Sequence, residues 1–207
     1  MEQAALFPMP APRGPTEPIV RTADIEGIYR WTLHRAWGSG PCVLWCGTNP
    51  STADGLKDDP TIRREVRFSF LWGFGSMVKV NFYPFRSPSM AELRGWLKGV
   101  NSNYPAREAW MRNLRVITDL IKCADLHIAV WGNEIDPEHL RFFYTVTDSG
   151  VFTPEVEAAS YNDPGFVAPK VEWHCLGTNK DGSPRHSLAR GKHRVPDTQR
   201  PVLWRAA

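Results

Sequence analysis

The chain has 207 residues, a formal charge of +3 at neutral pH and nine tryptophans. This length is sufficient for one domain with a sizeable core. The sequence contains no apolar run long enough for a membrane span, and its N-terminus lacks the charged and apolar regions of a secretion signal. We therefore expect a cytoplasmic protein that does not act at a membrane.

Proline and positive charge are concentrated at the two ends. Residues 1–20 carry five prolines and no apolar period, which predicts a disordered tail. Residues 180–205 hold seven Lys or Arg against two Asp, a local charge of +5. Such a segment suits a polyanion such as DNA or a nucleotide, and it equally suits a solvated tail. We expect a single α/β domain at 21–190, followed by a basic C-terminal tail at 191–207.

The four cysteines do not indicate a metal site. Cys42 and Cys46 would share one face of a strand, but they would lie about 13 Å apart. Cys123 and Cys175 are isolated, and no Cys-x-x-Cys spacing occurs. We expect neither a metal nor another cofactor.

Strands are expected where apolar runs end in turn-forming residues. Residues 28–37 alternate between apolar and polar side chains, which is typical of a half-buried strand. Because residues 38–41 (Gly-Ser-Gly-Pro) lead directly into the apolar segment 43–46, we expect these two strands to form an antiparallel hairpin. Further strands are expected at 77–83, 126–131 and 171–176.

Helices are expected between these strands. Asp59-Pro60 is typical of an N-cap followed by proline at the first helical position. A capping box begins at Ser89, and apolar helical faces follow Pro105 and Pro137. Residues 148–170 are rich in Pro, Gly, Asn and Asp, so we expect a long loop there.

Strands that alternate with helices after a leading strand indicate an α/β fold. We expect a three-layer sandwich with a mainly parallel four-stranded central sheet plus a leading antiparallel strand. Open sheets of this kind bind ligands at the carboxyl ends of their strands, where Asn49, Asn81 and the loop 177–188 would lie. An asparagine side chain offers a donor and an acceptor, which suits the edge of a nucleobase. We therefore expect these residues to share one pocket.

Four segments resemble motifs of the uracil-DNA glycosylase superfamily. Gly47-Thr48-Asn49-Pro50-Ser51 resembles the water-activating Gly-x-Asn-Pro-Gly motif of its mismatch-specific members. Residues 78–86 resemble its second strand, where an Asn commonly reads the base, and residues 129–132 resemble its third strand. Ser183-Pro184-Arg185-His186 is similar to its closing His-Pro-Ser-Pro loop, in a rearranged order. The resemblance spans residues 43–190 and implies a uracil-DNA-glycosylase-like fold.

A more specific resemblance is to an uncharacterised family of bacterial and phage proteins. Asn49-Pro50-Ser51-Thr52-Ala53-Asp54 and the segment 59–64 match its pattern. The segment 180–188, which contains Asp181-Gly182-Ser183-Pro184-Arg185-His186, also matches, with Ser187 where that family usually has Pro. This resemblance implies no established activity.

The glycosylase resemblance implies hydrolysis of an N-glycosidic bond after the base has been flipped out of the DNA. It implies that Asn49 positions the attacking water and that Asn81 binds the base edge. His186 would stabilise the departing base. Asp54 or Asp59 would act as a general base, although Asp59 is better suited to cap the helix that follows it.

The same resemblance implies further contacts with the nucleic acid. Phe82 or Tyr83 would stack on the base. Additional nucleic-acid contacts are expected from Ser51, Lys180, Ser183 and Arg185.

Two other interpretations remain: a phage-type enzyme that modifies DNA bases, and a non-catalytic protein that binds nucleic acid or a nucleotide.

Overall fold

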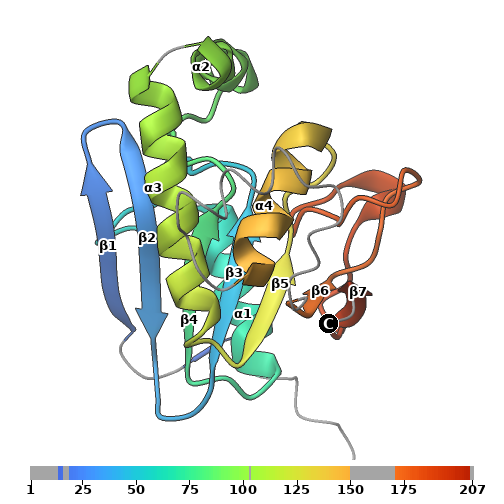
Figure 1. The fold of residues 1–207 in the computed structure, drawn as a ribbon. Helices are drawn as coiled ribbons and strands as arrows, with labels where there is room; N and C mark the ends of the chain where they lie inside the picture. The colour runs from blue at the N-terminus through green and yellow to red at the C-terminus, as the bar shows by residue number, and fades with distance from the viewer. Residues whose placement is uncertain (1–13, 16–18, 103, 150–170, 206–207) are drawn as a thin grey trace, which may run out of the picture.

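The computed structural model describes residues 14–15, 19–102, 104–149 and 171–205, and it has the α/β architecture shown in Figure 1. Most of the tail expected at 1–20 and of the loop expected at 148–170 lies outside these residues. Within the described part of the chain, no helix is long and apolar enough to cross a membrane.

A single sheet forms the centre of the molecule, with the strand order β1-β2-β4-β3-β5-β6-β7 among the described residues. β4, β3, β5 and β6 run parallel to one another, so the expected parallel core of four strands is confirmed. β1, β2 and β7 are antiparallel to their neighbours. The strands are β1 (Val20–Glu26), β2 (Tyr29–Ala36), β3 (Cys42–Gly47), β4 (Ser76–Asn81), β5 (Leu126–Ala129), β6 (Trp173–Cys175) and β7 (Val202–Arg205).

The prediction of an antiparallel hairpin between residues 28–37 and 43–46 is wrong, because these two strands are not neighbours in the sheet. β2 pairs with β1 on one side and with β4 on the other, so β4 lies between β2 and β3. The connection between β2 and β3 passes over the start of β4, where Trp37 N donates to Gly75 O and Gly75 N donates to Pro41 O. A Cβ on Gly75 would lie 2.6 Å from the carbonyl carbon of Ser39. The crossing therefore depends on a residue without a side chain.

Helices cover both faces of the sheet, which makes three layers (Figure 1). Val43 and Trp45 of β3 pack in the core on the side of α1. Leu44 and Cys46 pack in the core on the side of α3 and α4. The α-helices are α1 (Pro60–Leu71), α2 (Met90–Ser102), α3 (Tyr104–Ile121) and α4 (Pro137–Ser149).

The C-terminal segment is part of the domain, whereas the sequence predicted a basic tail at 191–207. β7 extends the sheet as its outermost strand beside β6. Val195 is fully buried in the core on the α1 side. Arg64 and Arg67 of α1 form ion pairs of 3.3 and 3.2 Å with Asp197. Apolar burial and these ion pairs together hold the segment against α1.

Candidate functional site

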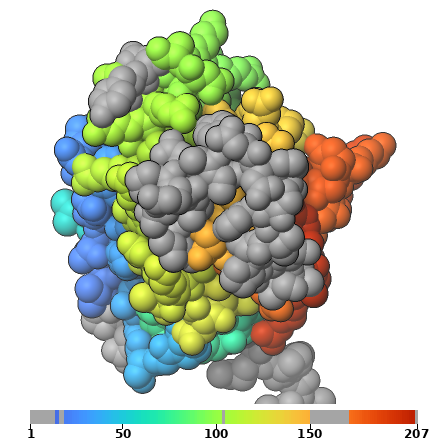
Figure 2. Space-filling view, viewed as in Figure 1, coloured from blue at the N-terminus to red at the C-terminus, as the bar shows by residue number. Residues whose placement is uncertain are grey.

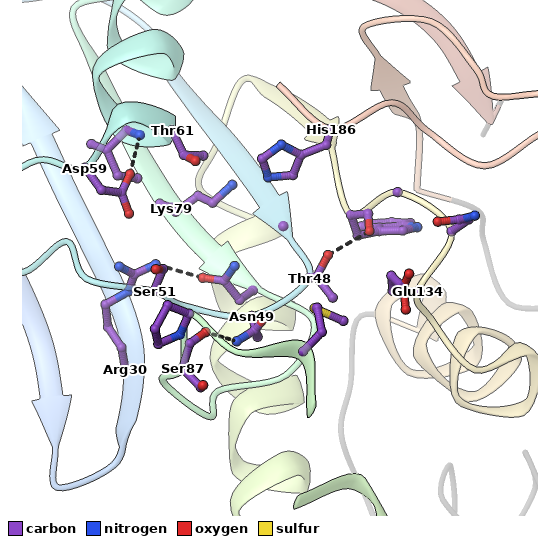
Figure 3. A pocket seen from close by; sticks show the side chains of 18 residues that line it. Arg30, Thr48, Asn49, Ser51, Asp59, Thr61, Lys79, Ser87, Glu134 and His186 are labelled. Atoms are coloured by element: carbon purple, nitrogen blue, oxygen red, sulfur yellow. Dashed lines mark hydrogen bonds between the residues drawn. The ribbon is translucent and has the colours of Figure 1, made fainter. Parts of the chain in front are cut away.

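A cavity of about 340 Å³ lies at the carboxyl ends of β3 and β4 (Figure 3). Its walls come from these strand ends, the N-terminal end of α1, the loop after β5 and the loop after β6. As expected, Asn49, Asn81 and His186 all line it. The parallel strands place residues that are far apart in the sequence around one space.

Two polar side chains of β4 lie against the bare backbone at the end of β3. β3 and β4 pair in parallel, with Trp45 opposite Lys79 and Gly47 opposite Asn81. A Cβ on Gly47 would lie 2.8 Å from Asn81 Nδ2 and 2.9 Å from Lys79 Nζ. Because residue 47 is glycine, both nitrogens fit beside the strand end, where they line the cavity.

The orientation of the Asn81 amide is set by a buried arginine. Arg30 of β2 is 3% exposed, and its Nη2 donates to Asn81 Oδ1 at 2.9 Å. Its Nη1 donates to the Ala53 carbonyl at 3.0 Å. Burial lowers the pKa of Arg30 to about 10, so the guanidinium stays charged at neutral pH. With Oδ1 occupied by Arg30, Asn81 presents its amide nitrogen to the cavity.

Lys79 is held by a carboxylate beneath the cavity. Its Nζ lies 2.8 Å from Oε1 of Glu65, a residue of α1 that is fully buried. Ser187 Oγ donates to the same oxygen at 3.0 Å. Burial raises the pKa of the Glu65 carboxyl, and the neighbouring Lys79 charge opposes that rise. Lys79 therefore has a fixed position and retains N–H groups for a ligand.

His186 supplies a third donor. Its Nδ1 accepts a hydrogen bond from the backbone N–H of Leu188 at 3.0 Å, so the proton of the neutral ring resides on Nε2. Burial, followed by the charge of Lys79, lowers the pKa of His186 to about 4. The ring is therefore neutral at neutral pH. In Figure 3 the side chains of Lys79 and His186 point toward one another across the cavity.

Asn49 has a structural role that its position in a turn did not reveal. Its Nδ2 donates to the carbonyl oxygens of Ser87 at 2.8 Å, Pro50 at 3.1 Å and Phe85 at 3.2 Å. These bonds hold the loop after β3 against the loop after β4. Within the described part of the chain its Oδ1 accepts no hydrogen bond, so this oxygen is available to a ligand or water.

Of the two aspartates considered as a general base, only Asp59 lines the cavity. Its Oδ1 accepts from Ile62 N at 2.9 Å, which confirms the expected N-cap of α1. Asp54 instead accepts hydrogen bonds from the backbone N–H groups of Leu56 and Lys57, both at 2.8 Å. Those two bonds lower the pKa of Asp54. Asp54 thus closes a turn away from the cavity, because its carboxylate satisfies two backbone donors of its own loop.

The expected stacking role of Phe82 and Tyr83 is wrong. Both side chains are fully buried, and their rings pack in the core beneath α3 and α4. Tyr83 OH lies 3.0 Å from His139 Nδ1 of α4. The chain beyond Asn81 remains bound to the end of β3, since Phe82 N donates to Gly47 O. These aromatic rings are directed into the core, and neither lines the cavity.

The residues expected to contact nucleic acid are divided between different places. Ser51 lines the cavity. Lys180 is exposed, and Ser183 Oγ donates to Asp181 Oδ1 at 2.7 Å. Arg185 Nε donates to the Thr178 carbonyl at 2.9 Å, within its own loop. Of the loop after β6, the structure therefore places only His186 at the cavity.

Three residues at the site were not expected from the sequence: Arg30, Glu65 and Lys79. A single lysine in the apolar strand 76–81 was the available signal, because an unpaired ammonium is costly to bury. Glu65 shares a helix face with the buried Ile62 and was a similar signal. Among the described residues, no group of three or more His, Cys, Asp or Glu could hold a metal ion.

A family model with the description "Protein of unknown function (DUF1643)" matches residues 30–147, more than half of the chain. The chain belongs to this family. The DUF1643 match contains Arg30, Asn49, Lys79 and Asn81, and it ends before β6 and His186. The expected membership of an uncharacterised family is thereby confirmed. No curated protein and no solved structure matches the chain.

Proposed function

We propose that this cavity holds a single nucleobase and that the protein hydrolyses the N-glycosidic bond of that base in DNA. The observation that carries the proposal is the convergence of three hydrogen-bond donors: Asn81 Nδ2, Lys79 Nζ and the Nε2–H of neutral His186. Donors held in place before the reaction stabilise the negative charge that develops on a departing base. The volume of about 340 Å³ lies within the range of small-ligand pockets.

The donor array favours bases that present carbonyl oxygens. Asn81 has its acceptor occupied by Arg30, and His186 has its acceptor nitrogen occupied by Leu188. A base edge with an exocyclic amine would place its own N–H donor against the donors of the cavity. We therefore propose that uracil, thymine and hypoxanthine are accepted in preference to cytosine and adenine.

The proposed reaction uses water as the nucleophile. Asp59 Oδ2 and Asn49 Oδ1 are side-chain oxygens without a hydrogen bond among the described residues, and both residues line the cavity. Asn49 orients the water, and Asp59 accepts its proton as the oxygen bonds to C1′ of the sugar. The bond between C1′ and the base nitrogen breaks, and its electron pair leaves with the base. A base inside a duplex cannot reach this cavity, so it must first be flipped out.

The test is the release of free base from single-stranded and duplex oligonucleotides that carry uracil, mismatched thymine, hypoxanthine or cytosine. Asp59→Asn retains an N-cap side chain, so α1 is preserved, but the variant lacks the carboxylate that accepts the proton from water. We expect it to lower base release by about 100- to 10,000-fold. Asp54→Asn is the matched control and should remain active, because Asp54 does not line the cavity. Absence of release across the whole panel overturns the proposal.

A second candidate is a non-catalytic protein that binds a nucleotide. The observation that favours it is the environment of the Arg30 guanidinium. Among the described residues, its two side-chain hydrogen bonds go to neutral acceptors, Asn81 Oδ1 and the Ala53 carbonyl. A phosphate in the cavity would compensate this buried charge. Calorimetry with uridine and uridine monophosphate separates the candidates. Tight binding of the monophosphate alone, without release of any base, favours the second.

A further inference from the structure

A second cavity, of about 410 Å³, adjoins the candidate site. Trp131, Gly132 and Asn133, in the loop after β5, line both cavities. Its other walls come from the start of α4, the loop 181–184 and β7. The loop after β6 projects at the side of the molecule in Figures 1 and 2. A ligand in the first cavity would therefore be separated from the second by a single loop.

We call this second cavity the Trp204 groove. Trp204 is only partly buried, and its Nε1 donates to the Gly182 carbonyl at 3.0 Å, which fixes the indole relative to the loop after β6. Its ring centroid lies 5.4 Å from that of Trp131, at an interplanar angle of 76°. The other apolar side chains of the groove are Ile135, Pro137, Leu140 and Pro184.

The groove differs from the candidate site in its chemistry. Its walls are largely aromatic and aliphatic, and the charged residue that lines it is Asp181, whose carboxylate accepts from Ser183 at 2.7 Å. A carboxylate at the rim disfavours a phosphate. An uncharged heterocycle with a π-face suits such walls, because stacking on an aromatic side chain does not depend on the identity of the base.

From this juxtaposition we infer that the Trp204 groove binds the base of the nucleotide next to the one in the first cavity. This inference rests on the proposed function, because it takes the first cavity as the place of an extruded base. Because one loop lines both cavities, two neighbouring nucleotides of one strand suit this pair of cavities. Ser183, for which the sequence predicted a contact with nucleic acid, lines this groove.

The test compares two labelled single-stranded probes by fluorescence anisotropy. One is pentathymidylate, and the other has abasic sites on both sides of the central thymidine. We expect the protein to bind pentathymidylate about tenfold more tightly, which is the scale of one stacked base. In Trp204→Ala this preference should be lost. Trp204→Phe keeps a stacking ring without the hydrogen bond to Gly182, so it should restore most of the preference.

The matched control is Leu203→Ala, on the same edge strand, where Leu203 is 56% exposed and does not line the groove. It should keep the full preference. The inference is overturned if wild-type protein binds both probes equally, if Trp204→Ala keeps the preference, or if neither probe binds. The readout is binding and does not require base release. A Trp204-dependent preference without any release overturns the proposed function alone, whereas release without the preference overturns this inference alone.

Discussion

Arg30 determines which end of the Asn81 amide faces the cavity. The two residues lie on adjacent antiparallel strands, and Arg30 Nη2 donates to Asn81 Oδ1 at 2.9 Å. A guanidinium has only donors, so it fixes the amide oxygen toward itself. The consequence is a cavity in which Asn81 acts as a donor, together with Lys79 and His186.

Asn81→Asp tests this relationship directly. The new carboxylate would form an ion pair with Arg30, so the midpoint of thermal unfolding should be unchanged or higher. The cavity would lose a donor and gain a negative charge that opposes the departing base. Base release should therefore fall by at least about 100-fold, as for the loss of one oxyanion donor. Circular dichroism checks the fold, and an unchanged rate of release would contradict the assigned orientation.

Gly47→Ala should disturb the site more than the fold. The added methyl group would lie 2.8 Å from Asn81 Nδ2 and 2.9 Å from Lys79 Nζ, so both donors must move. We expect base release to fall at least about tenfold, because misplaced groups lose catalytic effect steeply. Gly95→Ala in α2 is the control, since its Cβ would meet nothing within 4 Å. It should stabilise the protein by about 0.5–1 kcal/mol and leave the rate unchanged.

The buried pair of Glu65 and Lys79 predicts strong coupling in a double-mutant cycle. Their side chains are 0% and 3% exposed. Glu65→Leu would leave an unpaired ammonium, so denaturant unfolding should show a loss of about 3–5 kcal/mol. Adding Lys79→Met should restore most of that stability, since both charges are then absent. Additive losses would show that the pair is not coupled. The double variant should still release base more slowly, because one donor is missing.

Local patterns were sufficient for the parallel core but not for the exact ends of its strands, since β4 ends at Asn81 where the expected strand ran to residue 83, and β5 ends at Ala129 where it ran to residue 131. Turn-forming residues that include Asn49 follow the apolar run 43–46, and Asn81 lies near the end of the strand expected at 77–83. Both mark the carboxyl edge of the sheet, and topology brings such edges together. The cap at Asp59 is a local device and was predictable for the same reason. β1 was not expected, because most of its residues are exposed and it lacks an apolar period.

The missed contacts are those between residues distant in the sequence. Glu65 and Ser187 are 122 positions apart, and Arg30 and Asn81 are 51 apart, so no local spacing indicates either pair. The assignment of Phe82 to the pocket failed for a different reason. Successive residues at a strand end point to opposite sides, so a residue one position beyond Asn81 can belong to the core.

The lowered pKa of His186 predicts that the stability of the protein decreases as the pH falls. Burial lowers the pKa of the folded-state ring from 6.5 to about 4. Between these two values the unfolded chain binds more protons than the folded protein, so stability falls as the pH falls. The slope from this one residue is at most about 1.4 kcal/mol per pH unit, and it vanishes above pH 7.

His186→Asn isolates this contribution from the carboxylates that titrate in the same range. An Asn side-chain oxygen can still accept from the backbone N–H two residues later, so the loop should keep its turn. The difference in free energy of unfolding between wild type and variant should be constant above pH 7. It should decrease steadily from about pH 6.5 to pH 4, where the wild-type ring becomes protonated. A difference that stays flat from pH 7 to pH 4 would mean that His186 titrates normally and is not enclosed as described.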